Sequence, residues 1–308
     1  MKKIIALLLC CLLVCSLTAC AWGETADPAD FSVSAPSGAP ALALSTLAVK
    51  NPERYTFVAA EAITAEFAGA TADFIIAPLN AGAKLYRAGK STYRLAAVVS
   101  WGNLFFASQR EGFSPEAMNG AEITLFGENT INAAVAQFAL AENGIVPAGV
   151  SYLAGAANTQ SLLLSDENAI VLTAEPALTA ARMKNERVTG FSLNTLYQNA
   201  TGSDGFPQAA LFVRADVAEE QPEAVNAYLQ LVKEACDLCA ADVNAVAEAA
   251  VTLELLPNVK VATQAIPGCA LRFVPAAEAR EQIELTAGID LSQFGGDLPA
   301  DDFYYEAK

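Results

Sequence analysis

The sequence predicts an α/β fold of two lobes, each built on a mainly parallel sheet with helices on both faces. Short β-rich runs alternate with alanine-rich helical stretches along most of the chain, which is typical of βαβ units. The chain has 308 residues, of which 54% are hydrophobic, so it can bury two domains or one domain with two lobes. A strand-like run that returns after the last of these units indicates more than one crossover between the lobes.

Three strand-helix units follow one another from Phe31. A turn with Gly, Pro, Ser or Asn separates strand from helix in the first and third units. The units are FSVSAP (31–36) with ALALSTLAV (41–49), RYTFVAA (54–60) with AITAEFAG (62–69), and ADFIIAP (72–78) with AGAKLYRAG (81–89). Two strand-like runs come next, RLAAVVSW (94–101) and LFFASQ (104–109), and we expect the first crossover there.

A second set of units predicts the other lobe. Ser114 and Pro115 are typical of a helix start, with serine at the N-cap and proline at the first helical position. A helix is predicted to start at Asn129 or Thr130 and to end at 143–144. The remaining predicted elements are strands at 121–127, 150–155 and 169–176, helices at 158–165 and 177–184, a return strand at 206–216, and helices at 222–241 and 242–255.

The first 30 residues predict export. Two lysines precede an apolar run over 4–15, and small residues precede Cys20, which is the order of a secretory signal. The run is short for a membrane span, which needs about 20 residues; an uncleaved membrane anchor is the alternative. LTAC (17–20) resembles a bacterial lipobox. We therefore expect a signal peptide at 1–19, a lipidated linker at 20–30, and an extracytoplasmic protein anchored to the bacterial cell membrane by lipid on Cys20.

The charge of the chain argues against a nucleic-acid partner. The formal net charge is -16, and it becomes -18 when Lys2 and Lys3 leave with the signal peptide. A charge of this sign repels phosphate backbones and anionic lipid headgroups. We therefore expect membrane contact through lipid alone and no nucleic-acid partner.

The residues that most enzymes and metal sites use are scarce. The chain has no histidine, which excludes Ser-His-Asp and Cys-His nucleophiles. Cys236 and Cys239 recur at helical spacing with apolar residues, so we expect them in the core; a disulfide involving Cys269 or a metal site is the alternative. No Walker loop, Rossmann glycine motif or GxSxG motif is present. We expect no metal, no cofactor and a binding protein rather than an enzyme.

The order of these units resembles the substrate-binding proteins of ABC importers, specifically the group for nitrate, sulfonates, taurine and thiamine precursors. These proteins have the type II periplasmic-binding-protein fold. The segments that carry the resemblance are the lipobox, PSGAPALAL (36–44), ADFIIAPLNAGAKLYRAG (72–89), VVSWGNLFFAS (98–108), GENTINAAVAQFAL (127–140), LTAEPALTAARM (172–183) and FPQAALFVRAD (206–216). The resemblance implies lobe 1 at 31–104 plus 209–308, lobe 2 at 105–208, a ligand cleft between them, and a monomer that serves an ABC permease and ATPase.

The carboxyl ends of strands and the helix starts that follow them predict the ligand contacts, because such ends face a crevice in open α/β sheets. The predicted contacts are Ser37, Gly38, Ala39, Asn80, Trp101, Asn129, Thr130, Thr173 and Glu175. Each has a structural alternative. Serine, asparagine and threonine cap helices, glutamate in a first helical turn complements the helix dipole, and tryptophan is usually buried.

No arginine or lysine stands at a predicted strand tip, so the sequence gives no positive sign of a strong anion. Asn80, Asn129, Glu128 and Glu175, with Trp101 and Phe126 as flat walls, favour a neutral or weakly cationic heteroaromatic ring, such as a pyrimidine or vitamin precursor. The alternatives are a nitrate or alkylsulfonate binder, an enzyme on the same fold, and a lipoprotein that presents ligand to a sensor.

Overall fold

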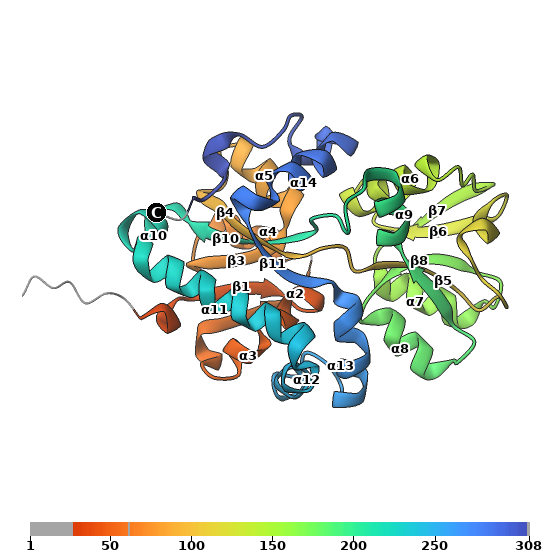
Figure 1. Ribbon diagram of the computed structural model, residues 1–308, viewed down its shortest axis with the longest axis horizontal. Helices are drawn as coiled ribbons and strands as arrows, with labels where there is room; N and C mark the ends of the chain where they lie inside the picture. The colour runs from red at the N-terminus through yellow and green to blue at the C-terminus, as the bar shows by residue number, and fades with distance from the viewer. Residues whose placement is uncertain (1–26, 61, 307–308) are drawn as a thin grey trace, which may run out of the picture.

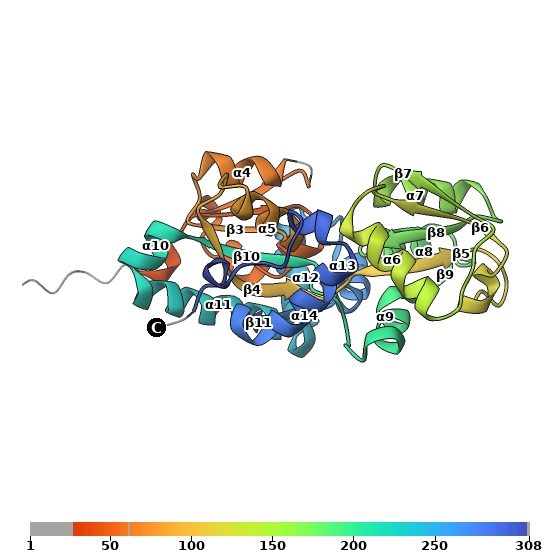
Figure 2. The same ribbon diagram turned by 90° about the horizontal axis from the view of Figure 1, so that it is seen from above.

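The computed structural model describes residues 27–60 and 62–306. Two sheets lie side by side along the long axis of the molecule (Figure 1, Figure 2). The first sheet has the order β11-β4-β10-β3-β1-β2 and the second β7-β6-β8-β5-β9. The predicted signal peptide, the lipobox with Cys20 and most of the predicted linker lie outside the described residues.

The eleven described strands are β1 (Val33–Pro36), β2 (Tyr55–Val58), β3 (Phe74–Pro78), β4 (Tyr93–Ser100), β5 (Leu104–Ser108), β6 (Glu122–Phe126), β7 (Gly149–Leu153), β8 (Ile170–Ala174), β9 (Thr189–Ser192), β10 (Ala209–Arg214) and β11 (Leu271–Pro275). The α-helices are α2 (Ala39–Leu42), α3 (Ser45–Ala48), α4 (Ile63–Gly69), α5 (Leu79–Arg87), α6 (Ile131–Glu142), α7 (Ala156–Ser165), α8 (Ala177–Lys184), α9 (Leu193–Thr201), α10 (Ala215–Glu220), α11 (Pro222–Ala241), α12 (Val243–Thr252), α13 (Val259–Ala265) and α14 (Ala276–Ile289). Short 3-10 helices are η1 (Pro28–Asp30), η2 (Pro52–Arg54), η3 (Pro115–Met118), η4 (Ile266–Cys269), η5 (Leu291–Phe294) and η6 (Asp301–Phe303). None of the helices in the described part combines the length and apolarity that crossing a membrane requires.

The chain passes between the sheets in two segments that touch each other. The first leads from β4 into β5, and the second leads from α9 into β10. At Gly102 the backbone has φ +85, and a Cβ there would meet the Phe206 ring at 2.7 Å. A Cβ at Gly205 would meet the Trp101 carbonyl oxygen at 2.5 Å. Glycine therefore allows the two crossings to pack together. The lobe boundaries that we expect, at 31–104 plus 209–308 and at 105–208, stay a prediction.

The two sheets are mixed, so the expectation of mainly parallel sheets needs correction. In the first sheet, β1 pairs in parallel with β2 and β3, whereas β10 lies antiparallel between β3 and β4. In the second, β6 pairs in parallel with β7 and β8, whereas β5 lies antiparallel between β8 and β9. β5 and β10 each enter from the other lobe, β5 after β4 and β10 after α9, whereas the third reversed strand, β11, is antiparallel to β4 and follows η4. A fully buried strand has the same apolar sequence in either direction, so the pattern could not reveal the reversal.

Helices cover both faces of the first sheet, and β3 shows how. Phe74 and Ile76 pack in one core cluster with Tyr228 of α11. Ile75 and Ala77, which point the opposite way, belong to a different cluster with residues of α4 and α5. Because successive side chains alternate across a strand, a strand covered on both faces must be apolar throughout.

Several predicted elements differ in detail. The helix expected over 41–49 is two four-residue helices, α2 and α3. Ser114 precedes η3, but its hydroxyl donates to the Glu116 carboxylate at 2.6 Å instead of capping a backbone N–H. β9, α9 and everything after residue 255 were not predicted as separate elements.

The cysteines of α11 pack as predicted. Cys236 and Cys239 are buried, and Cys269 is buried near them; all three are free thiols. Burial raises the pKa of Cys239 to about 12 and raises that of Cys236 as well. These thiols therefore behave as small hydrophobic groups.

We predict that Gly82→Ala destabilises the protein. Gly82 of α5 lies on the Phe212 ring of β10, and an added Cβ would approach the ring carbon Cζ at 2.3 Å. Overpacking of this kind costs about 1–3 kcal/mol, which outweighs the gain of about 1 kcal/mol in helix propensity. Gly288→Ala in α14 is the matched control, because its Cβ would meet open space. In urea unfolding, the midpoint of Gly82→Ala should lie below that of the natural protein and the midpoint of Gly288→Ala above it. Equal midpoints for the two variants would contradict this packing.

Candidate functional site

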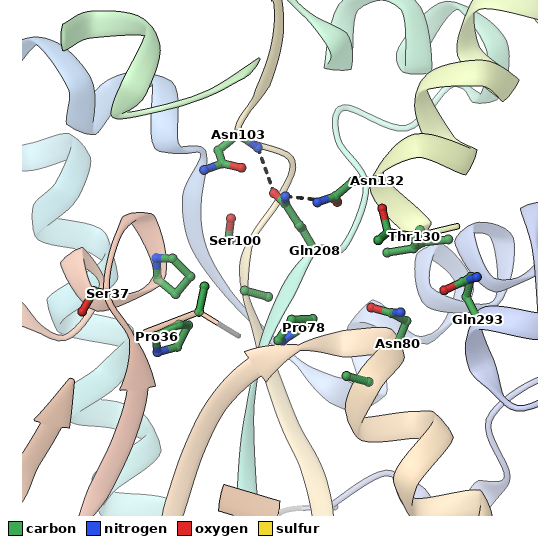
Figure 3. A pocket seen from close by; sticks show the side chains of 15 residues that line it. Pro36, Ser37, Pro78, Asn80, Ser100, Asn103, Thr130, Asn132, Gln208 and Gln293 are labelled. Carbon is green, nitrogen blue, oxygen red and sulfur yellow. Dashed lines mark hydrogen bonds between the residues drawn. The ribbon is translucent and has the colours of Figure 1, made fainter. Parts of the chain in front are cut away.

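A cavity of about 330 Å³ opens where the strands of the first sheet end and face the second lobe (Figure 3). Pro36, Pro78 and Ser100 are the last residues of β1, β3 and β4. Asn80 lies in the first turn of α5, and Asn132 lies in the first turn of α6 across the cavity. The full lining is Pro36, Ser37, Pro40, Ala60, Pro78, Asn80, Ala81, Ser100, Asn103, Thr130, Ile131, Asn132, Gln208, Ala209 and Gln293. The first sheet, the start of α6 in the second lobe and both crossings therefore contribute to its wall.

The lining combines polar and apolar side chains and is uncharged. Five side chains are carboxamides, Asn80, Asn103, Asn132, Gln208 and Gln293, and three carry hydroxyls, Ser37, Ser100 and Thr130. Among the described residues that line it, none is charged and none is aromatic. A carboxamide has one carbonyl oxygen and two N–H donors, so the cavity can pair with both donors and acceptors of a ligand.

Two helices, α5 and α6, have their N-terminal turns at the cavity. α5 contributes Asn80 and Ala81, and α6 contributes Ile131 and Asn132. The N-terminus of a helix carries partial positive charge from its unpaired backbone N–H groups. Thr130 caps α6, because its side chain accepts from the Ala133 N–H at 3.4 Å. The helices thus make the wall mildly favourable to electron-rich ligand atoms.

Gln208 joins the crossings to the far wall. Its Oε1 accepts a hydrogen bond from the Asn103 backbone N–H at 3.0 Å, and its Nε2 donates to Asn132 Oδ1 at 3.3 Å (Figure 3). Its backbone N–H donates to the Ser100 carbonyl and its carbonyl accepts from the Leu79 N–H, each at 3.0 Å. One residue therefore connects the end of β4, the start of α5, the first crossing and the start of α6.

The structure brings some of the predicted contacts together. Ser37, Asn80 and Thr130 line this one cavity. Gly38, Ala39 and Asn129 are chain neighbours of lining residues but do not line it. Asn129 holds φ at 58°, a left-handed conformation that asparagine tolerates better than most residues. Its place in the turn before α6 explains the residue type.

Trp101 lies in the core, which is one of the two roles weighed for it. Its side chain is 4% exposed, and its indole N–H donates to the Arg272 carbonyl at 3.0 Å. The Arg272 guanidinium lies 4.5 Å from the ring centre and pairs with Asp204. Phe126 does not line the cavity either. The flat apolar walls that the sequence suggested are therefore absent from the described lining.

Glu175 anchors the first crossing to the second lobe, and Thr173 pairs with Phe105 inside the second sheet; neither residue lines the cavity. The Glu175 backbone pairs with Asn103 twice: its N–H donates to the Asn103 carbonyl, and its carbonyl accepts from Asn103 Nδ2 at 2.9 Å. Its carboxylate accepts from the Thr179 N–H at 3.1 Å and from the Thr179 hydroxyl at 2.9 Å. Burial raises the pKa of Glu175, and the hydrogen bonds from Thr179 oppose that rise.

The predicted contacts do not include Asn103, Asn132, Gln208 or Gln293. Asn132 and Gln208 did carry a signal: each is a polar residue beside a predicted helix start or return strand. Asn103, in the first crossing, and Gln293, in η5, do not lie at a predicted strand tip.

The fold has known counterparts. An ABC transporter structure from Parabacteroides distasonis matches with a TM-score of 0.77 at 19% identity, over 90% of this chain and 99% of that one. The alkanesulfonate-binding protein of Xanthomonas axonopodis, bound to MOPS, matches with a TM-score of 0.64 at 13% identity, over 91% and 99%. A putative nitrate transport protein of Thermoplasma volcanium matches with a TM-score of 0.53 at 13% identity, over 87% and 95%. No protein-family profile and no curated protein sequence matches the chain. The likeness establishes the two-lobed α/β fold.

We predict a pH-dependent stability difference between the natural protein and Glu175→Gln. Glutamine keeps both bonds to Thr179, because its oxygen accepts from the N–H and its NH₂ donates to the hydroxyl. Since the native pKa of Glu175 is raised, the folded state holds its proton longer than the unfolded state as the pH rises, and stability falls through that window. Glutamine does not titrate, so the variant does not lose stability in this pH window.

Thermal unfolding at about pH 4 and about pH 7 measures the effect, since the first value lies near the ordinary glutamate pKa. We expect the variant to gain stability relative to the natural protein at the higher pH. Other groups titrate alike in both proteins. A stability difference between the two proteins that is the same at both pH values would therefore contradict a raised pKa of Glu175.

Proposed function

We propose that this chain is the extracytoplasmic solute-binding component of an ABC importer, and that it holds its solute in the cavity between the lobes. The observation that carries the proposal is a cavity of about 330 Å³ whose wall comes from the first sheet, the start of α6 in the second lobe and both crossings. Its volume suits a small molecule. The printed names of structures with this fold, an ABC transporter and an alkanesulfonate-binding protein, support the same role.

The mechanism is closure of the lobes around the solute. A molecule that contacts Asn80 on one side and Thr130 or Asn132 on the other makes more bonds when the lobes are close. It therefore binds the closed state better and shifts the population toward that state, which a permease with its ATPase would recognise. No chemical step is needed, and a monomer suffices.

The lining favours an uncharged solute. Carboxamides and hydroxyls pair with neutral polar groups without the cost of leaving a charge unbalanced. The proposed ligand is therefore a neutral heteroaromatic ring, such as a pyrimidine or vitamin precursor. It would be held by these polar groups, because no aromatic residue is among the described residues that line the cavity. A nitrate or alkylsulfonate is the second candidate, because the N-terminal turns of α5 and α6 face the cavity.

The predicted lipid on Cys20 completes the proposal. A linker from Cys20 to η1 would keep the lobes at the membrane face, within reach of a permease. Two or three acyl chains would hold the protein there firmly, since each buried CH₂ contributes about 0.8 kcal/mol.

Calorimetry should show that the soluble chain, residues 22–308, binds a neutral heterocycle from a panel of pyrimidines and thiazoles more tightly than any alkylsulfonate or nitrate. Asn80→Ala should weaken that binding about tenfold, the cost of one or two hydrogen bonds. Asn244→Ala removes the same group from an exposed site of α12 and is the control. Binding of sulfonates alone would replace the proposed ligand class, and equal affinities for both variants would remove Asn80 from the site.

We predict that Cys20→Ser abolishes lipid attachment. In a bacterial host, the natural chain should incorporate radiolabelled palmitate and sediment with membranes. The serine variant should carry no label, because serine has no thiol to acylate. A labelled, membrane-bound variant would show that the attachment lies elsewhere in the chain.

A further inference from the structure

We propose that Gln208 fixes which end of the Asn132 carboxamide faces the cavity, and thereby requires the solute to present a hydrogen-bond acceptor there. Gln208 is thus a positioning residue, and Asn132 is the group that contacts the solute. The part that concerns the solute rests on the proposed function; the orientation of the two carboxamides does not.

The first step is that a backbone group sets the orientation of Gln208. The Asn103 backbone N–H can only donate, and it lies 3.0 Å from Gln208 Oε1. If the carboxamide of Gln208 were reversed, its NH₂ would face this N–H, and two donors would lose their partners. The backbone of Gln208 is itself held on both sides, by Ser100 and by Leu79. The side chain therefore has one favoured orientation, with its oxygen toward Asn103.

The second step carries this orientation to Asn132. With its oxygen committed, Gln208 offers Nε2 to the start of α6, at 3.3 Å from Asn132 Oδ1. Asn132 must accept there, so its own oxygen is engaged by Gln208. A reversed Asn132 would set two NH₂ groups against each other. The oxygen and nitrogen of an asparagine carboxamide can often exchange places. Here a chain of hydrogen bonds that starts at the Asn103 backbone N–H fixes their positions.

The consequence is a donor in the wall. Asn132 lines the cavity, and its Nδ2 has no protein partner within the described part of the chain. The polar group that this residue offers a solute is therefore an NH₂. A carbonyl oxygen or a ring nitrogen with a lone pair can bind it, whereas an amino group at that place faces another donor.

Side-chain amide NMR of the chain from residue 20 onward, without added solute, tests the orientation. All described helices and strands lie within this chain. In Gln208→Glu both carboxylate oxygens accept, so Asn132 must reverse and donate Nδ2 to the carboxylate. We expect one Nδ2 proton of Asn132 to move downfield and to exchange more slowly with water. Unchanged Asn132 signals in this variant would overturn the proposal.

Two further variants keep the test decisive. Gln208→Met removes both side-chain bonds without adding charge, so the Asn103 backbone N–H should exchange faster while the Asn132 Nδ2 protons do not move downfield. Gln293→Glu places a carboxylate in the same cavity without touching this chain of bonds, so the Asn132 signals should keep their positions. A downfield shift in Gln293→Glu as large as in Gln208→Glu would show a charge effect only, against the proposal.

Pyrimidine and pyrrole test the solute requirement, because pyrimidine offers only ring nitrogens with lone pairs, whereas pyrrole offers only an N–H donor. We expect the natural protein to bind pyrimidine at least about tenfold more tightly, and Asn132→Asp to lose or reverse this preference. Equal or tighter binding of pyrrole by the natural protein would overturn the required acceptor. If neither probe binds, the proposed ligand class fails, while the NMR result alone decides the role of Gln208.

Discussion

The backbone of the two crossings must find hydrogen-bond partners away from any sheet, and the rest of the site depends on how it does so. A buried polar backbone group without a partner costs as much as a lost hydrogen bond. Asn194 Nδ2 donates to the carbonyls of Trp101 and Gly102, at 2.8 and 2.9 Å. Gln208 Oε1 accepts from the Asn103 backbone N–H, and Asn103 Nδ2 donates to the Glu175 carbonyl. Carboxamides are suited to this task, because each can both accept and donate.

The same requirement gives the cavity its chemistry. Three of the carboxamides that satisfy or extend these bonds, Asn103, Asn132 and Gln208, also line the cavity. Rigidity and recognition are therefore supplied by one set of side chains. The lobes also meet beyond the crossings, where the Tyr197 hydroxyl of α9 lies 3.0 Å from the Thr286 hydroxyl of α14. A change in lobe orientation would have to break such contacts away from the crossings.

The sequence was informative wherever burial is periodic. Phe74 to Ala77 could be assigned to a doubly covered strand because the run is apolar throughout, and Cys236 and Cys239 to a helix core because the period of 3.6 is visible in the residues around them. The fold class and the helix at 222–241 follow from such periods. Strand tips also indicated Ser37, Asn80 and Thr130, since the carboxyl ends of strands meet at one edge.

The remainder depended on contacts between distant segments, which no local period records. The reversal of β10 and β5 follows from the entry of each strand from the opposite sheet. Trp101 is buried because Arg272, far away in sequence, covers its ring and accepts from its N–H. Asn103 and Gln208 face each other across 105 positions of the chain. A sequence pattern can show that such residues are polar, but not that they meet.

The uncharged lining has a consequence for the conditions under which the protein works. None of the described residues that line the cavity gains or loses a proton near neutral pH, and none attracts a counterion. Binding of a neutral solute to such a wall would not depend on acidification or on the salinity of the surroundings. A protein exposed to an unbuffered exterior would thus keep a constant affinity where a site built on ion pairs would not.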